Sequence, residues 1–163
     1  RDDVESRGLG DVYKRQIGAG CARKFASQGA SLILNARNVN KLSALKEELE
    51  KQYGAKIYLL PFDVRDRKAA TSALESLPKE WQSIDILVNN AGLVIGTDKE
   101  QEGSLDEWDI VIDTNIKALL AMTRLIVPGM VERKRGHIIN IGSIAGDAAY
   151  PGGSVYCVLQ RLL

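Results

Sequence analysis

Short apolar runs alternate with longer stretches of helical spacing from Gly18 onward, and this alternation constrains the fold more than any other feature. It is typical of βαβ units, in which helices cross between parallel strands. The runs are mostly apolar rather than alternating with polar residues, which indicates strands covered on both faces. We therefore expect an α/β fold with a parallel sheet whose strands lie within residues 31–36, 56–62, 84–89 and 136–141.

The stretches between these runs predict four helices, at residues 18–28, 41–53, 67–77 and 104 to about 134. The last has a clear start, because Ser104 followed by Glu107 fits a capping box, in which each side chain bonds the other's backbone amide. Pro128 lacks a backbone donor, so we expect it to kink or shorten the second half of this helix.

The beginning of the chain departs from this pattern. Residues 1–16 carry eight charged side chains and no run of three apolar residues, although a parallel sheet needs a buried strand before its first helix. The segment, particularly DVYKRQ, also resembles translated sequencing-adapter DNA. We therefore expect residues 1–16 to be non-native or disordered, with an ordinary flexible tail as the alternative, and residues 17–163 to form the domain.

Composition excludes several classes of function. The 163 residues include 22 basic and 21 acidic side chains, and a net charge of +1 gives no reason to expect a nucleic-acid partner. Cys21 and Cys157 lie far apart without ligand spacing, which excludes a structural zinc site and argues against a disulfide framework. No apolar run approaches the length of a membrane span, and no signal-peptide pattern is visible, so we expect no membrane partner and a cytoplasmic location.

Three polar motifs lie where predicted helices begin or strands end. Residues 17–20 (IGAG) open the first helix, where backbone amides can hold a phosphate, although two glycines there are also common in plain packing. Residues 89–92 (NNAG) end the third strand, at the edge where open α/β sheets bind ligands, although such residues also form turns. Ser143 follows the fourth strand, and Tyr156 follows Ser143; a serine can hold a substrate oxygen while a tyrosine passes it a proton.

In this order and at these spacings, the motifs resemble the short-chain dehydrogenase/reductase family. The resemblance runs from Ile17 to Tyr156 and includes residues 89–92, Asn115 in TNIK, and Ser143 in IGS. The segments LPKEWQSIDILVNNAGL, IDTNIKALLAMTR and PGMVERKRGHIINIGSIAG look most like the NADP-dependent 3-hydroxy acid dehydrogenases. The resemblance implies a Rossmann-like doubly wound sheet of strand order 3-2-1-4-5-6, here missing its first strand and its C-terminal part. The strands on either side of the missing one would then lie apart.

The resemblance also implies the chemistry of the site. Tyr156 would be the general acid/base, Ser143 would orient the substrate oxygen, and Asn115 would lie in the proton-relay path. The small-molecule substrate would be a 3-hydroxy acid, such as serine, allo-threonine or 3-hydroxypropionate, or its semialdehyde. The cofactor would be NADP, and intact relatives would be homodimers or homotetramers.

Four residues match the family's contacts to the phosphates of the cofactor. Ile17 and Gly18 correspond to the end of the phosphate turn, and Arg37 and Asn38 follow the strand where the family contacts the adenosine ribose. An acidic residue there would favour NAD, whereas the guanidinium of Arg37 suits the 2′-phosphate of NADP.

Three more residues match other contacts to the cofactor. The resemblance implies that Asp63 and Val64 contact the adenine and that Asn90 contacts a ribose. Asp63 has an alternative role, because an aspartate at this position can also cap the next helix.

The chain departs from the family pattern at three places. Gln160 stands one helical turn after Tyr156, where the family has a lysine, so it can hydrogen-bond the ribose but supplies no charge. Two glycines of the phosphate turn fall on Val12 and Gln16. The chain also ends at Leu163, where relatives continue. We therefore expect this chain to be an inactive fragment of an NADP-dependent enzyme.

Two alternatives remain open from the sequence. One is a different reductase of the same fold, such as one that acts on 3-oxoacyl thioesters. The other is a catalytically dead Rossmann binding module. Neither alternative includes a metal site.

Overall fold

The computed structural model describes residues 9–95, 99–148, 150 and 153–161. The expected non-native or disordered segment therefore lies partly outside the described residues. The longer helices and the strands, in chain order, are α1 (Leu9–Ser27), β1 (Leu32–Leu34), α2 (Val39–Tyr53), β2 (Ile57–Leu59), α3 (Arg67–Glu75), β3 (Ile86–Asn89), α4 (Leu105–Ile112), α5 (Ala118–Glu132), β4 (His137–Asn140) and α6 (Ser154–Arg161). Each strand lies inside the range predicted for it, so the predicted α/β architecture is confirmed.

The strands form two parallel pairs. β1 pairs with β2 in a register that sets Leu32 opposite Ile57, and β3 pairs with β4 in a register that sets Ile86 opposite His137. Within the described residues no strand joins β1 to β3, and the two pairs are separate sheets. This is the separation expected when the strand between them is lacking, because neighbouring strands must approach to about 4.8 Å to bond.

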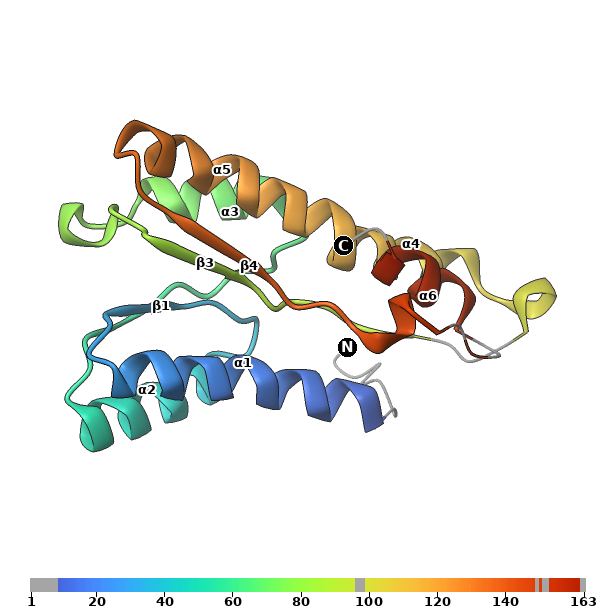
Figure 1. Ribbon diagram of the computed structural model, residues 1–163, viewed down its shortest axis with the longest axis horizontal. Coiled ribbons are helices and arrows are strands. Elements are labelled where there is room, and N and C mark those ends of the chain that lie inside the picture. Colours follow the sequence, from blue (N-terminus) through green and yellow to red (C-terminus); the bar gives the residue numbers. More distant parts are fainter. Residues whose placement is uncertain (1–8, 96–98, 149, 151–152, 162–163) are drawn as a thin grey trace.

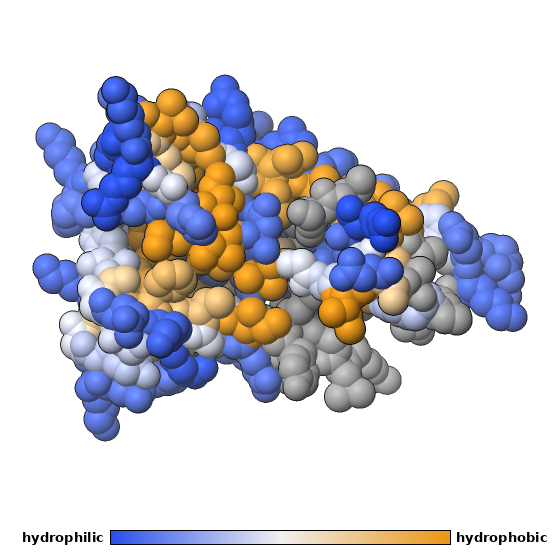
Figure 2. All heavy atoms as spheres, in the orientation of Figure 1, coloured by the Kyte–Doolittle hydropathy of each residue, from blue (hydrophilic) through white to orange (hydrophobic). Residues whose placement is uncertain are grey.

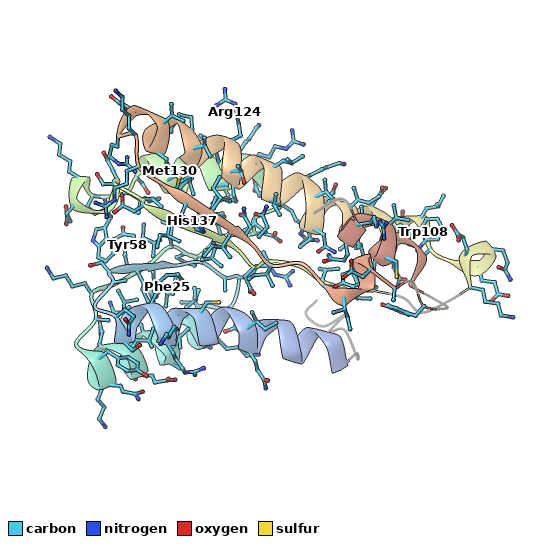
Figure 3. The ribbon with its side chains drawn as sticks, viewed as in Figure 1. Phe25, Tyr58, Trp108, Arg124, Met130 and His137 are labelled. Carbon is cyan, nitrogen blue, oxygen red and sulfur yellow. The ribbon has the colours of Figure 1, made fainter. Side chains whose placement is uncertain are left out.

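Helices cover both sides of the strands, as expected for a doubly wound fold. Figure 1 shows α1 and α2 on one side and α3 and α5 on the other. Leu49 of α2 is fully buried and packs in one core cluster with Ala26 of α1 and Ile57 of β2. On the opposite side, Tyr58 packs with the residues of α3, and Figure 3 shows Tyr58 and Phe25 on opposite sides of β1 and β2.

The helix α2 begins and ends where its sequence dictates. The side chain of Asn38 accepts a hydrogen bond from the Lys41 amide at 3.0 Å, which satisfies one of the free donors of the first turn. Gly54 ends the helix in the left-handed region, at φ 61°, where a residue without Cβ avoids strain. The N-cap residue Asn38 directly follows Arg37, in the turn between β1 and α2.

The predicted start of the first helix is wrong. The first helix begins at Leu9 rather than at Gly18, because residues 9–16 contain no proline and several good helix formers, so the helix extends through them. The long helix predicted over residues 104–134 is confirmed in extent, since residues 105–132 are helical without a break. Its regular α-helical turns are separated by a π-helical turn at Asp113–Lys117, which contains an extra residue, and Pro128 lies inside α5.

The predicted start of α4 is confirmed, since Ser104 is its N-cap and accepts from the Glu107 amide at 3.4 Å. Among the described residues, no helix is both long enough and apolar enough to cross a membrane.

Candidate active site

Asn115 lies in the π-helical segment between α4 and α5. Its side chain is 2% exposed, accepts a hydrogen bond from the Leu93 amide at 2.8 Å, and donates one to the Leu93 carbonyl at 2.9 Å. The π turn bulges the backbone, and such bulges often occur at functional sites. Asn115 therefore anchors the loop that follows β3.

Ser143 lies just beyond the end of β4. It is the N-cap of the short helix Ile144–Gly146, and its Oγ accepts a hydrogen bond from the Ala145 amide at 3.2 Å. A hydroxyl that accepts a bond still carries its own proton for donation. The Ser143 hydroxyl can therefore donate to a substrate oxygen while its position is held by the cap.

Tyr156 lies on α6 and is 6% exposed. It packs in one cluster with Cys157, with Ala145 from the turn after Ser143, and with Val94 from the loop that Asn115 anchors. Tyr156 thus belongs to this cluster, and Ser143 and Asn115 adjoin it beyond the carboxyl ends of β4 and β3, through their hydrogen bonds to Ala145 and to Leu93, the residue before Val94. Parallel α/β sheets bind their ligands at this edge.

Two side-chain amides in the same region have acceptor oxygens without a partner. Among the described residues, Oδ1 of Asn90 and Oε1 of Gln160 are buried and accept no hydrogen bond. A Cβ on Gly18 would lie 2.6 Å from Nδ2 of Asn90, so glycine at this position allows α1 to approach the end of β3. Gly18 therefore has a packing reason in this structure.

The expected phosphate turn is not formed at residues 17–20. Ile17 and Gly18 lie well inside α1, so their amides are not at a helix N-terminus, where a phosphate could bind. Val12 and Gln16, the positions of the two replaced glycines, belong to the same continuous helix. The cofactor roles of Ile17 and Gly18 remain predictions.

Charged residues cluster after β1 and β2. Arg65 forms a two-pronged ion pair with Asp63, with Nη2 at 2.6 Å and Nε at 3.0 Å from the carboxylate oxygens, and Nη1 of Arg37 lies 3.9 Å from the same carboxylate. The Arg37 side chain is 62% exposed. A cation in this position remains available to an incoming anion.

The hydrogen bonds from Arg65 lower the pKa of Asp63, and the charge of Arg37 adds to this effect, while burial opposes it. The alternative role of Asp63 as a helix cap is wrong, because Asp66 caps α3 by accepting from the amides of Lys68 and Ala69. Val64 is partly buried against the cluster that includes Ala70.

Sequence reasoning overlooked Arg65 and the bonds between Asn115 and Leu93. The role of Arg65 could have been recognised from the sequence, because a cation two residues after Asp63 can close a turn by an ion pair. The bonds between Asn115 and Leu93 join residues that are 22 positions apart, so no local pattern in the sequence indicates them. Among the described residues, no group of three or more potential metal ligands is present.

Comparison with known proteins identifies relatives along most of the chain. The model of the short chain dehydrogenase family matches residues 13–158. The NADP-dependent 3-hydroxy acid dehydrogenase YdfG of Escherichia coli K12 is 50% identical over 134 residues, which cover 82% of this chain and 52% of the relative. The chain thus spans about half the length of the curated relatives it matches.

Solved structures support the same relationship. The crystal structure of serine dehydrogenase from Escherichia coli matches with a TM-score of 0.80 at 48% identity, covering 86% of this chain and 63% of that one. The closed form of serine dehydrogenase complexed with NADP+ matches with a TM-score of 0.79 at 46% identity, covering 86% of this chain and 55% of that one.

Proposed function

The chain belongs to the short-chain dehydrogenase family, and from this premise we propose that its site is that of an NADP-dependent oxidoreductase. The reaction would transfer a hydride between nicotinamide and a 3-hydroxy acid or its semialdehyde. We propose the serine, allo-threonine and 3-hydroxypropionate class; the relatives at 48–50% identity are named as a 3-hydroxy acid dehydrogenase and a serine dehydrogenase, which supports 3-hydroxy acids and serine. The observation that carries the proposal is the placement of Asn115, Ser143 and Tyr156 around one buried cluster.

The residues present fit the two ends of NADP. Arg37 offers an exposed guanidinium for a 2′-phosphate, beside Asn38 and the Asp63–Val64 pair. Asn90 offers an unpartnered acceptor for a ribose hydroxyl. The central phosphates fit less well, because contacts from the amides of Ile17 and Gly18 would require α1 to begin near Gly18.

In the proposed reaction, Tyr156, Ser143 and Asn115 each have one role. Nicotinamide, when bound, supplies the acceptor or donor of the hydride. In the oxidation direction, Tyr156 acts in its deprotonated form: the substrate hydroxyl gives its proton to the phenolate oxygen and becomes a carbonyl, and the hydride from the substrate carbon would go to the bound nicotinamide. Ser143 donates a hydrogen bond to the substrate oxygen throughout, and Asn115 holds the loop after β3 against the site.

We further propose that this chain, with its present residues, does not catalyse the proposed hydride transfer. Gln160 replaces the cation that the family places one turn after the tyrosine, and α1 runs through the phosphate turn. Positioning of the reacting groups contributes roughly 7–11 kcal/mol to such reactions, so loss of these supports removes most of the catalysis. The unpartnered Oε1 of Gln160 favours a second candidate, a binding module that holds NADP without catalysis. A reductase of 3-oxoacyl thioesters remains the alternative substrate assignment.

The remaining assignments are parts of the same proposal. Residues 17–163 form a partial NADP-binding Rossmann domain, and residues 1–16 are a non-native segment whose described part, from Leu9, is helical. The protein acts in the cytoplasm, and its intact relatives are homodimers or homotetramers.

An assay of NADPH formation tests the proposal. The chain is incubated with NADP+ and serine or 3-hydroxypropionate, with Tyr156→Phe as the control. We expect equal, background absorbance from both, and turnover by the unmodified chain above Tyr156→Phe would overturn its inactivity.

A chimera tests the catalytic residues directly. Residues 17–159 replace the corresponding segment of the Escherichia coli relative, and the lysine at the position of Gln160 is kept. We expect oxidation of serine with NADP+, lost in Ser143→Ala and in Tyr156→Phe. Activity only toward 3-oxoacyl thioesters would favour the alternative substrate class.

A further inference from the structure

Arg65 is a charged residue beside the candidate cofactor site to which the proposed function gives no role. It follows Asp63 by two residues, in the turn between β2 and α3. Its Nε and Nη2 donate to the Asp63 carboxylate at 3.0 and 2.6 Å, and its backbone amide donates to Oδ1 at 3.0 Å. Three donors from one residue therefore face a single carboxylate.

The backbone around this ion pair holds its two members in place. The Asp66 amide donates to the Asp63 carbonyl at 2.9 Å, which closes the turn. Nδ2 of Asn35 donates to the Phe62 carbonyl at 3.1 Å, which ties the end of β1 to the end of β2. Because the paired groups belong to one closed turn, their pairing costs less side-chain entropy than that of two long side chains on an open surface.

The Asp63 carboxylate also lies beside Arg37, the residue proposed to bind the 2′-phosphate. Its Oδ2 is 3.9 Å from Nη1 of Arg37. A negative charge at this distance attracts the guanidinium and repels a phosphate. An uncompensated Asp63 would therefore oppose the binding of NADP and favour a cofactor with a free 2′-hydroxyl.

The charge of Arg65 removes this conflict. Its hydrogen bonds lower the pKa of Asp63, and the same bonds raise the pKa of Arg65, so both groups stay ionised and balance each other. The charge of Asp113 also raises the pKa of Arg65, but Asp113 is itself paired with Lys117 at 2.7 Å. Among these five described residues, the charge left over is the positive charge of Arg37.

We propose that Arg65 determines the preference of this chain for NADP over NAD, because it neutralises Asp63 and leaves the guanidinium of Arg37 to the 2′-phosphate. Arg65 is thus a positioning residue that acts through Asp63. Specificity is a difference between two affinities, and Arg65 raises one of them by removing a repulsive charge rather than by adding a contact. The inference rests on the proposed NADP function and deepens it.

The substitution Arg65→Met tests the proposal, since methionine keeps an aliphatic stem but has neither charge nor donors. The dissociation constants of adenosine 2′,5′-bisphosphate and adenosine 5′-monophosphate are measured for the whole chain. These two ligands differ only in the 2′-phosphate, so their ratio cancels any change in the contacts to the adenine. Arg67→Met, the same charge change at the exposed start of α3, is the matched control.

The expected loss depends on the presence of Asp63. Arg65→Met should reduce the preference for the bisphosphate about 3- to 10-fold, and Arg67→Met should leave it within about twofold. Arg65→Lys, which keeps the charge, should retain most of the preference. The double variant Asp63→Asn with Arg65→Met should recover it to within about twofold, because no carboxylate then remains to be neutralised.

Each other outcome identifies a different error. An unchanged preference in Arg65→Met overturns the inference, and so does equal weakening of both ligands, which indicates a purely structural role. A loss that persists in the double variant also overturns it, because Arg65 would then contact the phosphate itself. If the unmodified chain binds the bisphosphate no better than the monophosphate, the NADP assignment fails and the inference fails with it.

Discussion

Among the described residues, the two buried side-chain oxygens without a hydrogen-bond partner both lie in the part of the chain around β3 and β4, and none lies around β1 and β2. In the first unit (residues 9–64), Asn35 donates to the carbonyls of Leu60 and Phe62 at 2.8 and 3.1 Å. In the second unit (residues 84–161), the orphaned acceptors of Asn90 and Gln160 lie beside the candidate catalytic residues. The buried oxygens without a hydrogen-bond partner thus lie in the region where a ligand is expected. Elsewhere the local sequence agrees with the fold.

The two units also differ in their apolar surface. Figure 2 shows apolar side chains gathered over the side of the molecule that carries β4 and α5. The large apolar residues exposed in the second unit include Ile86, Leu120, Leu125, Val131, Ile138, Ile144 and Val158. The exposed ones described in the first unit are Ile17 and Val39. The described residues of the first unit therefore leave fewer large apolar side chains exposed.

The largest expected effect tests the core of the first unit. Leu49→Ala removes a side chain with no exposure and should lower the free energy of unfolding by about 3–5 kcal/mol, because a cavity remains. The matched change Leu120→Ala in the second unit, at a side chain 60% exposed, should stay within about 0.5 kcal/mol. Denaturant titration measures both, and similar losses would abolish the contrast.

The next prediction concerns the anchor of the second unit. Asn115→Ala leaves the amide and carbonyl of Leu93 without their partner, which should cost about 2–3 kcal/mol of unfolding free energy. Asn40→Ala, at an exposed position of α2, is the control and should have little effect. If the two variants unfold alike, Asn115 does not anchor the loop.

A smaller effect is expected at the cofactor's phosphate. Arg37→Asp should weaken NADPH binding about tenfold or more, a loss of about 1.4 kcal/mol, and NADH binding much less, because a favourable charge becomes a repulsive one. Arg67→Asp, an equal charge change at the exposed start of α3, controls for the overall field. Equal weakening of NADPH and NADH would remove Arg37 from the 2′-phosphate site.

The smallest expected effect is on the acid stability of the first unit. The pKa of Asp63 is lowered by Arg65, so its ion pair contributes stability above the unfolded pKa of about 3.9 and loses it as the pH falls through the folded value. Asp63→Asn should therefore reduce stability near neutrality and flatten the loss below about pH 4. Thermal midpoints across pH measure this, and an unchanged acid limb would contradict it.

Most of the fold could be predicted from local patterns in the sequence. Apolar runs placed all four strands, since each strand lies within a run and no distant contact is needed to recognise it. The start of α1 was predicted wrongly because residues 9–16 have no helix-breaking proline, and the glycines at 18 and 20 resembled a boundary. The π segment was not predicted because one extra residue per turn changes the hydrophobic period too little to detect.

The identities of the site residues come from family spacing, which gives Asn115, Ser143 and Tyr156, and their catalytic roles remain predictions. The contacts of the site could not be predicted in the same way. The ion pair of Asp63 with Arg65 and the buried oxygen of Gln160 depend on side-chain geometry, which spacing does not encode.

The separation of the strands into two pairs has a consequence for how the chain folds. Leu32 meets Ile57 across 25 residues, whereas Ile86 meets His137 across 51, and the doubled loop adds about 0.6 kcal/mol of closure entropy. During synthesis the first pair is complete once β2 has emerged, long before β4 exists. The first pair should therefore form early and alone, and β3 must wait with an unprotected edge until β4 has emerged.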